Sequence, residues 1–400
     1  HMKHIYDNVH RQYTQWEEPL IAIINTPEFQ RLKRIKQLGV CHHVFPGATH
    51  TRFEHSLGVG YLARKSLESL QRRQPELKID EYTILTFQLA GLCHDLGHGP
   101  LSHAFDHFLS TLTTNTSFSQ HEERSVSMLQ HIVHKYTISI EPSVIQNACE
   151  LIHPQSKHLP SWWYQIIAND DTGIDVDKFD YLLRDTLMTG MVCNDIDVNR
   201  FIDYARVVAK PTANKNVLCY PEKLQFDINQ LFMTRHRLHA QVYQHPTVRS
   251  YEMMYTDILH TLRDTFLQII RGKQNIEWLT EWTDDMFTDG YLYSFAHKQM
   301  FNLSEFEHAT HVLHRIHSRN HYALVKEMQC KSNSQRQTFL RTVQTANTRI
   351  DPVTIGYRTN PLFSVSFYDK KDPTKCVKSA STSAIFHYHS RDFIVRVYEI

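Results

Sequence analysis

The stretch that decides the expected fold is Leu92-Cys93-His94-Asp95-Leu96-Gly97-His98-Gly99-Pro100. An imidazole and a carboxylate stand next to each other at His94 and Asp95, and a second imidazole follows at His98. Side chains of this kind suit a divalent metal at a hydrolytic centre. A His-Asp pair by itself is more often an ordinary hydrogen-bonded pair than a metal site, so the rest of the chain has to decide.

The pattern upstream predicts a buried helix that ends at the metal candidate. Leu85, Leu89 and Leu92 share one helical face that leads directly to His94. Helical signals continue to about residue 272, and Asn25-Thr26-Pro27-Glu28 has the composition of a capped helix start. The strongest apolar stripe predicts a helix of five turns through Tyr251, Met254, Ile258, Leu262, Phe266 and Ile269.

The period of the apolar residues changes to two near the end of the sequence. After about residue 350, alternation predicts two strands, at Phe363, Val365 and Phe367 and at Phe393, Val395 and Val397. Residues 211–216 predict a turn. We therefore expect a mainly α-helical protein, with a core at residues 2–320 and a small mixed α+β lobe at residues 321–400.

Composition favours a globular protein of a reducing compartment, the cytoplasm or nucleus. Hydrophobic residues make up 41% of the chain, and 43 Lys and Arg nearly balance 42 Asp and Glu, so no net charge attracts nucleic acid or a membrane. Seven cysteines without C-x-x-C spacing favour free thiols. No apolar stretch reaches the ~20 residues of a membrane span, and the polar start shows no signal peptide.

Two further segments carry side chains that could complete a metal site together with His94 and Asp95. His55 lies at the start of a predicted helix, and one of three closely spaced carboxylates at residues 175–180 can supply a fourth ligand. Two imidazoles and two carboxylates suit iron, manganese, zinc or another divalent ion, and they leave positions for water and a phosphate oxygen.

The chain also carries several short motifs in a fixed order. They are Gln30-Arg31-Leu32, Ile35-Lys36-Gln37-Leu38-Gly39, Val44-Phe45-Pro46-Gly47-Ala48, Arg52-Phe53-Glu54-His55-Ser56-Leu57-Gly58-Val59, Cys93 to Pro100, Gly173-Ile174-Asp175-Val176-Asp177-Lys178, and Thr234-Arg235 with Tyr243-Gln244-His245. Together they resemble the HD-domain superfamily of metal phosphohydrolases and, more closely, the SAM-and-HD-domain deoxynucleoside triphosphate triphosphohydrolases. The resemblance covers residues 2 to about 270 and resumes at 360–368 and 396–398. It implies an HD-domain helical core and a small mixed lobe, here without a SAM domain.

The resemblance implies a role for each residue that matches a family motif. The metal ligands would be His55, His94, Asp95 and Asp177. The residues around the scissile phosphate would be His98, His103, Asp106, His121 and Glu122. The substrate-binding residues would be Gln37, Leu38, Arg52, His103, Lys178, Tyr181, Asp185, Arg235, Tyr243 and Gln244. His121 would protonate the leaving 5′-oxygen, with Asp106 orienting it.

Within the substrate-binding set, the resemblance separates phosphate, sugar and base contacts. Arg52, Lys178 and Arg235 match triphosphate binders, although any one cation taken alone is more often an ordinary ion-paired side chain. The sugar and base contacts would be Gln37 and Asp185 at the 3′-hydroxyl, Tyr243 beneath the deoxyribose, and Leu38 and Gln244 at the base. Tyr243 alone would more often be a core residue.

The family pattern is weaker at its regulatory nucleotide site between subunits. That site would comprise Lys3, His4, Asn25, Gln30 and Lys33. Asn25 stands where the family has an aspartate, and an amide offers guanine one acceptor and a competing donor. Lys33 replaces an arginine and lacks its planar fork. We expect that guanosine triphosphate is not an activator, so that the protein is constitutively active, activated by another nucleotide, or regulated through its oligomeric state alone.

Further histidine groups have no motif context, and we interpret them as structural or surface residues. They are Cys41-His42-His43, His387-Tyr388-His389, and the series His308, His311, His314 and His317.

These residues predict metal-dependent hydrolysis of deoxynucleoside triphosphates to deoxynucleoside and triphosphate by a homo-oligomer, a dimer or tetramer. The ion would be iron, manganese, zinc or magnesium, with an allosteric nucleotide as a second ligand. Two alternatives stay open. One is an HD-type phosphodiesterase or nuclease that acts on cyclic or oligomeric nucleotides, and the other is a catalytically idle protein that binds nucleic acid or a partner.

Overall fold

The helix that ends at His94 lies in the centre of the fold. In the computed structural model, α4 (Glu81–Cys93) packs along α3 (Arg52–Arg73), as the sequence predicts for a buried helix. A Cβ on Gly91 of α4 would lie only 3.1 Å from the Val59 carbonyl oxygen of α3, so glycine permits this close approach. As a result, the rings of His94 and His55 lie 5.2 Å apart.

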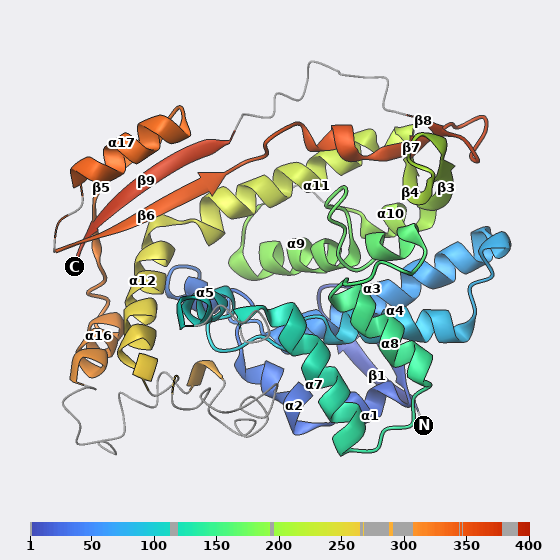
Figure 1. Cartoon of the computed structure of the whole chain (residues 1–400), viewed down its shortest axis with the longest axis horizontal. Helices are drawn as coiled ribbons and strands as arrows, with labels where there is room; N and C mark the ends of the chain where they lie inside the picture. The colour runs from blue at the N-terminus through green and yellow to red at the C-terminus, as the bar shows by residue number, and fades with distance from the viewer. Residues whose placement is uncertain are drawn as a thin grey trace.

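Other helices pack around this pair. The structure describes residues 2–112, 119–192, 196–264, 267, 288–290, 307–343, 345, 347–377 and 391–400. α8 (Pro142–Ile152) packs on α4, and α9 (Val176–Thr189) packs on α3 (Figure 1). The remaining α-helices of the described residues are α1 (Leu20–Ile24), α2 (Pro27–Gln30), α5 (His103–Leu112), α7 (His121–Lys135), α10 (Val198–Tyr204), α11 (Gln225–Leu238), α12 (Pro246–Thr261), α16 (Glu307–His317) and α17 (Asn333–Val343). The prediction of a mainly α-helical core is confirmed.

Short helical turns connect these elements. They are the 3-10 segments Arg31–Arg34, Gly39–His43, Pro75–Leu77, Ser161–Gln165, Pro211–Ala213, Glu222–Leu224 and Pro361–Ser364, and the π-helical segment His239–Tyr243. The predicted helix start at Thr26 is confirmed, because its side chain accepts from the Phe29 N–H. The apolar stripe of α12 is buried from Tyr251 to Ile258, whereas Phe266 and Ile269 lie outside the described residues.

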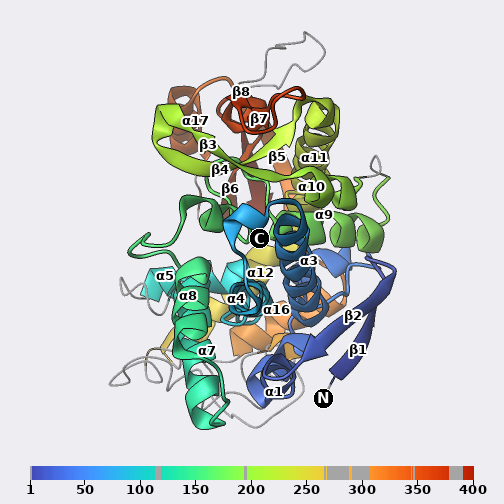
Figure 2. The same ribbon diagram turned by 90° about the vertical axis from the view of Figure 1, so that its right-hand side faces the viewer.

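A two-stranded hairpin at the N-terminus departs from the helical expectation. β1 (Met2–Asp7) pairs antiparallel with β2 (Gln12–Glu17), and the Asp7 side chain accepts two backbone N–H groups of the turn. Only Thr14 and Trp16 of β2 are buried, so the pattern is too short and polar to predict a strand. Figure 2 shows the hairpin on the opposite side of the helices from the other sheets.

The first two strands of the four-stranded sheet are also absent from the prediction. β3 (Arg206–Lys210) and β4 (Lys215–Pro221) form a hairpin across the predicted turn at 211–216. β4 pairs in parallel with β7 (Ser366–Tyr368), which pairs with β8 (Cys376–Val377). A strand after residue 321 therefore joins strands of the predicted core, and the domain boundary at residue 320 stays a prediction.

The three-stranded sheet has the last strand of the chain at its centre. β9 (Asp392–Glu399) lies between β5 (Ala323–Cys330) and β6 (Thr348–Ile355), and α17 packs against β9 (Figure 1). The predicted strand at residues 393–397 is confirmed. From β9, Arg396 and Tyr398 donate hydrogen bonds to the carbonyls of Gln244 and Pro246.

The predicted strand at residues 363–367 is wrong in its first half. Phe363 lies in the 3-10 segment Pro361–Ser364 and is 70% exposed, and β7 begins only at Ser366. The reason is local, because the Asn360 side chain accepts from the Leu362 N–H and Pro361 favours a helical start.

The described helices and cysteines agree with two simple expectations from composition. Among the described residues, no helix combines the length and the apolar character that a membrane crossing requires. The six described cysteines are all free thiols, which the scattered spacing predicts.

Candidate metal centre and substrate cavity

The four predicted metal ligands converge from three helices. His55 lies in the first turn of α3, His94 and Asp95 directly follow α4, and Asp177 lies in the first turn of α9. The Nε2 atom of His55 is 3.1 Å from an Asp177 oxygen and 3.5 Å from an Asp95 oxygen. The Nε2 atom of His94 is 3.5 Å and 3.4 Å from oxygens of the same two carboxylates. Neighbouring ligands that bind one ion at ~2.1 Å lie about 3.0–3.4 Å apart, which is close to these spacings. The ligand atoms of His55, His94 and Asp95 all lie within 4.8 Å of one another, and Asp177 approaches this group through the two histidines.

The two imidazoles are oriented for metal binding. His55 Nδ1 lies 2.7 Å from Asp180, and His94 Nδ1 lies 2.8 Å from the Gly91 carbonyl oxygen. Each Nδ1–H therefore donates, and each Nε2 faces the site as the atom that can bind a metal ion. Within the described part of the chain, both Nε2 atoms are buried without a hydrogen-bond partner. Nitrogen atoms and carboxylate oxygens that face one another in a buried site need a cation between them, either a proton or a metal ion, and this donor set fits a divalent metal.

The charges around the ligands also favour a cation. Burial opposes a charge on His55, yet the nearby carboxylates of Asp177 and Asp180 raise its pKa to about 10, so the ring holds a proton wherever no metal ion neutralises these carboxylates. Burial likewise opposes the charge on Asp95, but the Arg52 guanidinium holds the pKa of that carboxyl well below its usual value. The carboxylates stay ionised, and the site as a whole attracts positive charge.

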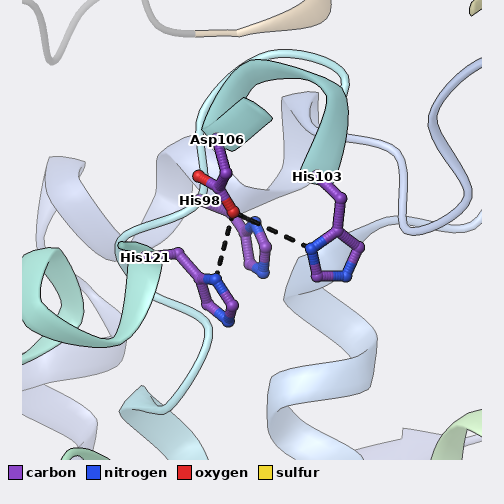
Figure 3. A group of neighbouring side chains, drawn as sticks. All are labelled: His98, His103, Asp106 and His121. Atoms are coloured by element: carbon purple, nitrogen blue, oxygen red, sulfur yellow. Dashed lines mark hydrogen bonds and ion pairs between the residues drawn. The ribbon is translucent and has the colours of Figure 1, made fainter. Parts of the chain in front are cut away.

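A second polar group lies beside the metal ligands and consists of His98, His103, Asp106 and His121 (Figure 3). His121 is the first residue of α7, and its Nδ1 lies 3.1 Å from Asp106. Its ring stacks on His98 with the centroids 4.0 Å apart. Because Asp106 holds Nδ1, the Nε2 atom of His121 is the one that can carry a proton to a substrate.

Electrostatics distinguish the members of this group. Burial opposes the charge on Asp106, but His103, His121 and Arg124 hold its pKa far below the usual range. Burial and the nearby Arg52 hold the pKa of His98 well below its usual value. Asp106 is therefore a carboxylate and His98 a neutral imidazole. Since Arg124 already pairs with Asp106, we interpret the group as a site for proton transfer rather than for a second metal.

Both groups open onto one cavity of about 440 Å³. The predicted site residues in its lining are Gln37, Leu38, Arg52, His94, Asp95, His98, His103, His121, Glu122, Asp177, Tyr181, Asp185, Tyr243 and Gln244. Within the described residues, the Gln37 Oε1 atom is buried and accepts no hydrogen bond. Asp185 accepts from His50 at 2.8 Å and from the Tyr243 hydroxyl at 2.5 Å. The cavity thus offers hydrogen-bonding groups beside an aromatic ring.

The three predicted triphosphate binders differ in their placement. Arg52 lines the cavity, but its guanidinium is buried and pairs with Asp95. Lys178 binds Asp175 at 2.7 Å, and Arg235 lies over the Tyr357 ring. Neither Lys178 nor Arg235 belongs to the cavity lining among the described residues, so their contact with phosphate stays a prediction.

Sequence reasoning misses several residues of the site. The cavity lining also includes His239, Arg249 and Glu252. Asp180 and His50 do not line the cavity but bind residues of the site. Asp180 binds the ligand candidate His55, and His50 binds Asp185 of the cavity lining. Asp180 is one of the three carboxylates that the sequence offers as a ligand, and it follows Asp177 by one helical turn. His50 and His239 lie beside or within the quoted motifs, whereas Arg249 and Glu252 have no motif context.

The residues predicted for a regulatory nucleotide site lie outside this cavity. Lys3 and His4 are exposed on β1, and Asn25 is exposed at the end of α1. Gln30 donates to a backbone carbonyl at 2.6 Å, and Lys33 is exposed above an aromatic ring. A regulatory role for these five residues stays a prediction.

The histidine groups without motif context do not join the site. His43 stacks on Tyr251 with the centroids 4.4 Å apart. The exposed residues His308, His311 and His314 lie on α16 and, within the described chain, belong to no group of converging ligand atoms. Residues 387–389 lie outside the described residues.

Residues 52–185 match the family model of the HD domain. This segment contains all four metal-ligand candidates and the group from His98 to His121. Fold, site and match together define an HD-domain protein.

Curated relatives narrow the class. The deoxynucleoside triphosphate triphosphohydrolase SAMHD1 of Gallus gallus is 34% identical over 99% of this chain and 72% of its own length. The protein of that name in Homo sapiens is 32% identical over 99% of this chain and 70% of its own length. The SAMHD1 homolog of Dictyostelium discoideum is 34% identical over 81% of this chain and 60% of its own length. The chain therefore belongs to the SAMHD1 family of HD-domain deoxynucleoside triphosphate triphosphohydrolases, and the resemblance that the motifs indicate is confirmed.

Proposed function

We propose that this protein hydrolyses deoxynucleoside triphosphates to deoxynucleoside and triphosphate. One observation carries the proposal: the buried Nε2 atoms of His55 and His94 face the carboxylates of Asp95 and Asp177 beside a cavity of about 440 Å³. The relatives from chicken and human carry this activity in their names and match nearly all of the chain. When bound, a divalent ion at these ligands supplies Lewis acidity and lowers the pKa of a bound water.

The chain's own residues manage the proton of the leaving group. Attack of water on the α-phosphorus breaks its bond to the 5′-oxygen, which needs a proton to leave as a hydroxyl. His121 donates this proton from Nε2, while Asp106 holds Nδ1 and fixes the ring direction. The stacked ring of His98 limits rotation of His121, and Arg124 keeps Asp106 ionised and in place.

The same cavity offers groups for a deoxyribose. The buried Gln37 Oε1 is an acceptor that a 3′-hydroxyl can satisfy. Asp185 ties the Tyr243 hydroxyl to His50, so the tyrosine ring is held beneath the sugar and leaves little space for a 2′-hydroxyl. Leu38 and Gln244 are the proposed contacts to the base, and Arg52, Lys178 and Arg235 the proposed contacts to the triphosphate.

One assay separates this function from the two alternatives. The full chain is incubated with Mn²⁺ and each deoxynucleoside triphosphate, and the phosphate product is identified by ³¹P NMR. Release of triphosphate supports the proposal. Monophosphate with pyrophosphate would contradict it, and cleavage of cyclic or oligomeric nucleotides alone would favour a phosphodiesterase or nuclease. An absence of turnover with manganese, magnesium, iron and zinc would favour a protein that only binds nucleic acid or a partner.

A pair of matched variants tests the ligand assignment. Asp95→Asn should abolish both metal binding and turnover, because a neutral amide is a poor ligand for a divalent ion. Asp80→Asn makes the same chemical change at the start of α4, where Asp80 only caps the helix. Activity of Asp95→Asn close to that of Asp80→Asn would show that the ligand assignment is wrong.

Three finer properties complete the proposal. The resident ion is iron, manganese, zinc or magnesium, which metal analysis of the purified protein can identify. The protein is a dimer or tetramer, which light scattering can measure. The site of Lys3, His4, Asn25, Gln30 and Lys33 binds a nucleotide other than guanosine triphosphate or none, since Asn25 and Lys33 replace the guanine-reading pair of the family.

A further inference from the structure

The N-terminal hairpin reaches the metal centre through one side chain. His10 lies in the turn between β1 and β2, and its side chain is only 5% exposed. Its Nε2 lies 2.7 Å from one oxygen of Asp180, whose other oxygen lies 2.7 Å from Nδ1 of His55. A continuous set of hydrogen bonds therefore runs from the hairpin turn to a metal ligand.

Asp180 is held in one position by contacts on every side. It is fully buried, and Arg184 donates to its two oxygens at 2.8 and 2.9 Å. Arg184 also binds Asp7 at 2.9 Å, and Asp7 in turn accepts backbone N–H groups of the hairpin turn. A Cβ on Gly58 of α3 would lie 1.9 Å from Asp180, so only glycine leaves room for this carboxylate. The hairpin turn and the carboxylate thus share the same network.

Distance alone would also allow a second metal ion at Asp7, His10 and Asp180. Arg184 argues against it, because its guanidinium already binds both carboxylates and would have to leave for an ion to enter. A guanidinium and two carboxylates, all buried and paired, form a closed set of charges. The network therefore fits a support for His55 better than an additional metal site.

We propose that His10 is a positioning residue of the metal centre. It donates from Nε2–H to Asp180, Asp180 accepts from His55 Nδ1–H, and His55 Nε2 is thereby aimed at the ion. The inference rests on the proposed metal site. Partners of metal-ligating histidines change metal affinity by about 10–100-fold. His10 acts one step further out, and Arg184 still holds Asp180 without it, so we expect about tenfold weaker binding in His10→Ala.

Titration of the metal-stripped full chain with Mn²⁺, with free Mn²⁺ followed by electron paramagnetic resonance, measures this effect. Two conservative variants form a matched pair. The amide nitrogen of glutamine reaches the place of imidazole Nε2, whereas that of asparagine reaches only the place of Nδ1. His10→Gln should keep the wild-type Kd within about threefold, and His10→Asn should weaken binding about tenfold, like His10→Ala. The pair decides the question even where His10→Ala does not fold.

The outcomes separate this inference from the proposed function. Equal Mn²⁺ affinity in wild type, His10→Gln and His10→Asn overturns the positioning role but leaves the metal site standing. A purely structural role predicts that result, together with a lower melting temperature of the metal-free variants. A wild-type chain that binds no Mn²⁺ overturns both the metal site and this inference.

Discussion

Replacement of Gly97 by alanine tests how closely α7 must approach the loop after His94. A Cβ on Gly97 would lie 2.4 Å from the His121 carbonyl oxygen and 2.5 Å from the Ser125 nitrogen. Both are backbone atoms of α7, and ordinary contact with a Cβ begins at 3.4 Å. The loop and α7 must therefore separate by about 1 Å. Since His121 is the first residue of α7, this separation moves its ring away from His98.

The expected effect falls on chemistry more than on metal binding. Overpacking of this kind costs about 1–3 kcal/mol of stability, which urea unfolding can measure. A misplacement of about 1 Å at a catalytic group lowers the rate by up to about 100-fold. We expect kcat for triphosphate release to fall about 100-fold, with KM and the Kd for Mn²⁺ changed only a few-fold, because α7 carries none of the four ligand candidates.

Gly190→Ala is the matched control. Gly190 has φ of +70°, and no described atom lies within 4 Å of its added Cβ, so the variant has backbone strain without overpacking. It should lose about 1 kcal/mol of stability and keep its kcat. A kcat of Gly97→Ala within about threefold of wild type would refute the argument that the approach of α7 positions His121.

Three further predictions concern a carboxylate, the sugar site and regulation. Burial opposes the charge on Glu150, but hydrogen bonds from the backbone N–H groups of residues 155–157 lower its pKa. Glu150→Gln should therefore cost about 1–2 kcal/mol of stability near neutral pH. This difference should vanish as the pH falls through the lowered pKa, because the carboxylate then becomes protonated. Urea unfolding at a series of pH values from 7 downward measures this difference, and a difference that does not shrink at any acidic pH at which the protein stays folded would contradict the ionised state. Tyr243→Phe removes the bond to Asp185 and should lower kcat/KM for deoxynucleotides about five- to tenfold and weaken discrimination against ribonucleotides; unchanged discrimination would disprove a role of the hydroxyl. Turnover should proceed without guanosine triphosphate, and Asn25→Asp with Lys33→Arg should gain activation by it; strict dependence of the wild type would contradict this.

The candidate metal ligands could be proposed from the sequence because each stands in a short motif whose residue types suit a metal ion. The position of His94 follows from local information too, since the leucine spacing and Asp80 define α4 without help from the rest of the chain. Separate segments then meet because helices with buried faces must pack together. Residue type and helix periodicity were sufficient for α4 and for the pair at His94 and Asp95, whereas the choice of Asp177 among three carboxylates came from the family resemblance.

The supporting residues could not be predicted in this way. His10 and Arg184 are 174 positions apart and meet only when the hairpin docks on α9. A sequence shows the charge of Lys178 and Arg235 but not their partners, which are Asp175 and the Tyr357 ring. The strands β1 and β2 expose most of their side chains, so their pairing leaves no apolar pattern to read.

The central place of β9 has a consequence for biosynthesis. The ligand-bearing helices α3, α4 and α9 are complete once residue 189 has left the ribosome, whereas β5 and β6 cannot be joined until β9 follows. Arg396 and Tyr398 then bind the carbonyls of Gln244 and Pro246, next to the residues that line the cavity. Because N-terminal segments are synthesised first, the helices that carry the candidate ligands are complete well before β9 can support the cavity wall. The segment at Gln244 and Pro246 therefore gains these two hydrogen bonds only after β9 has been synthesised.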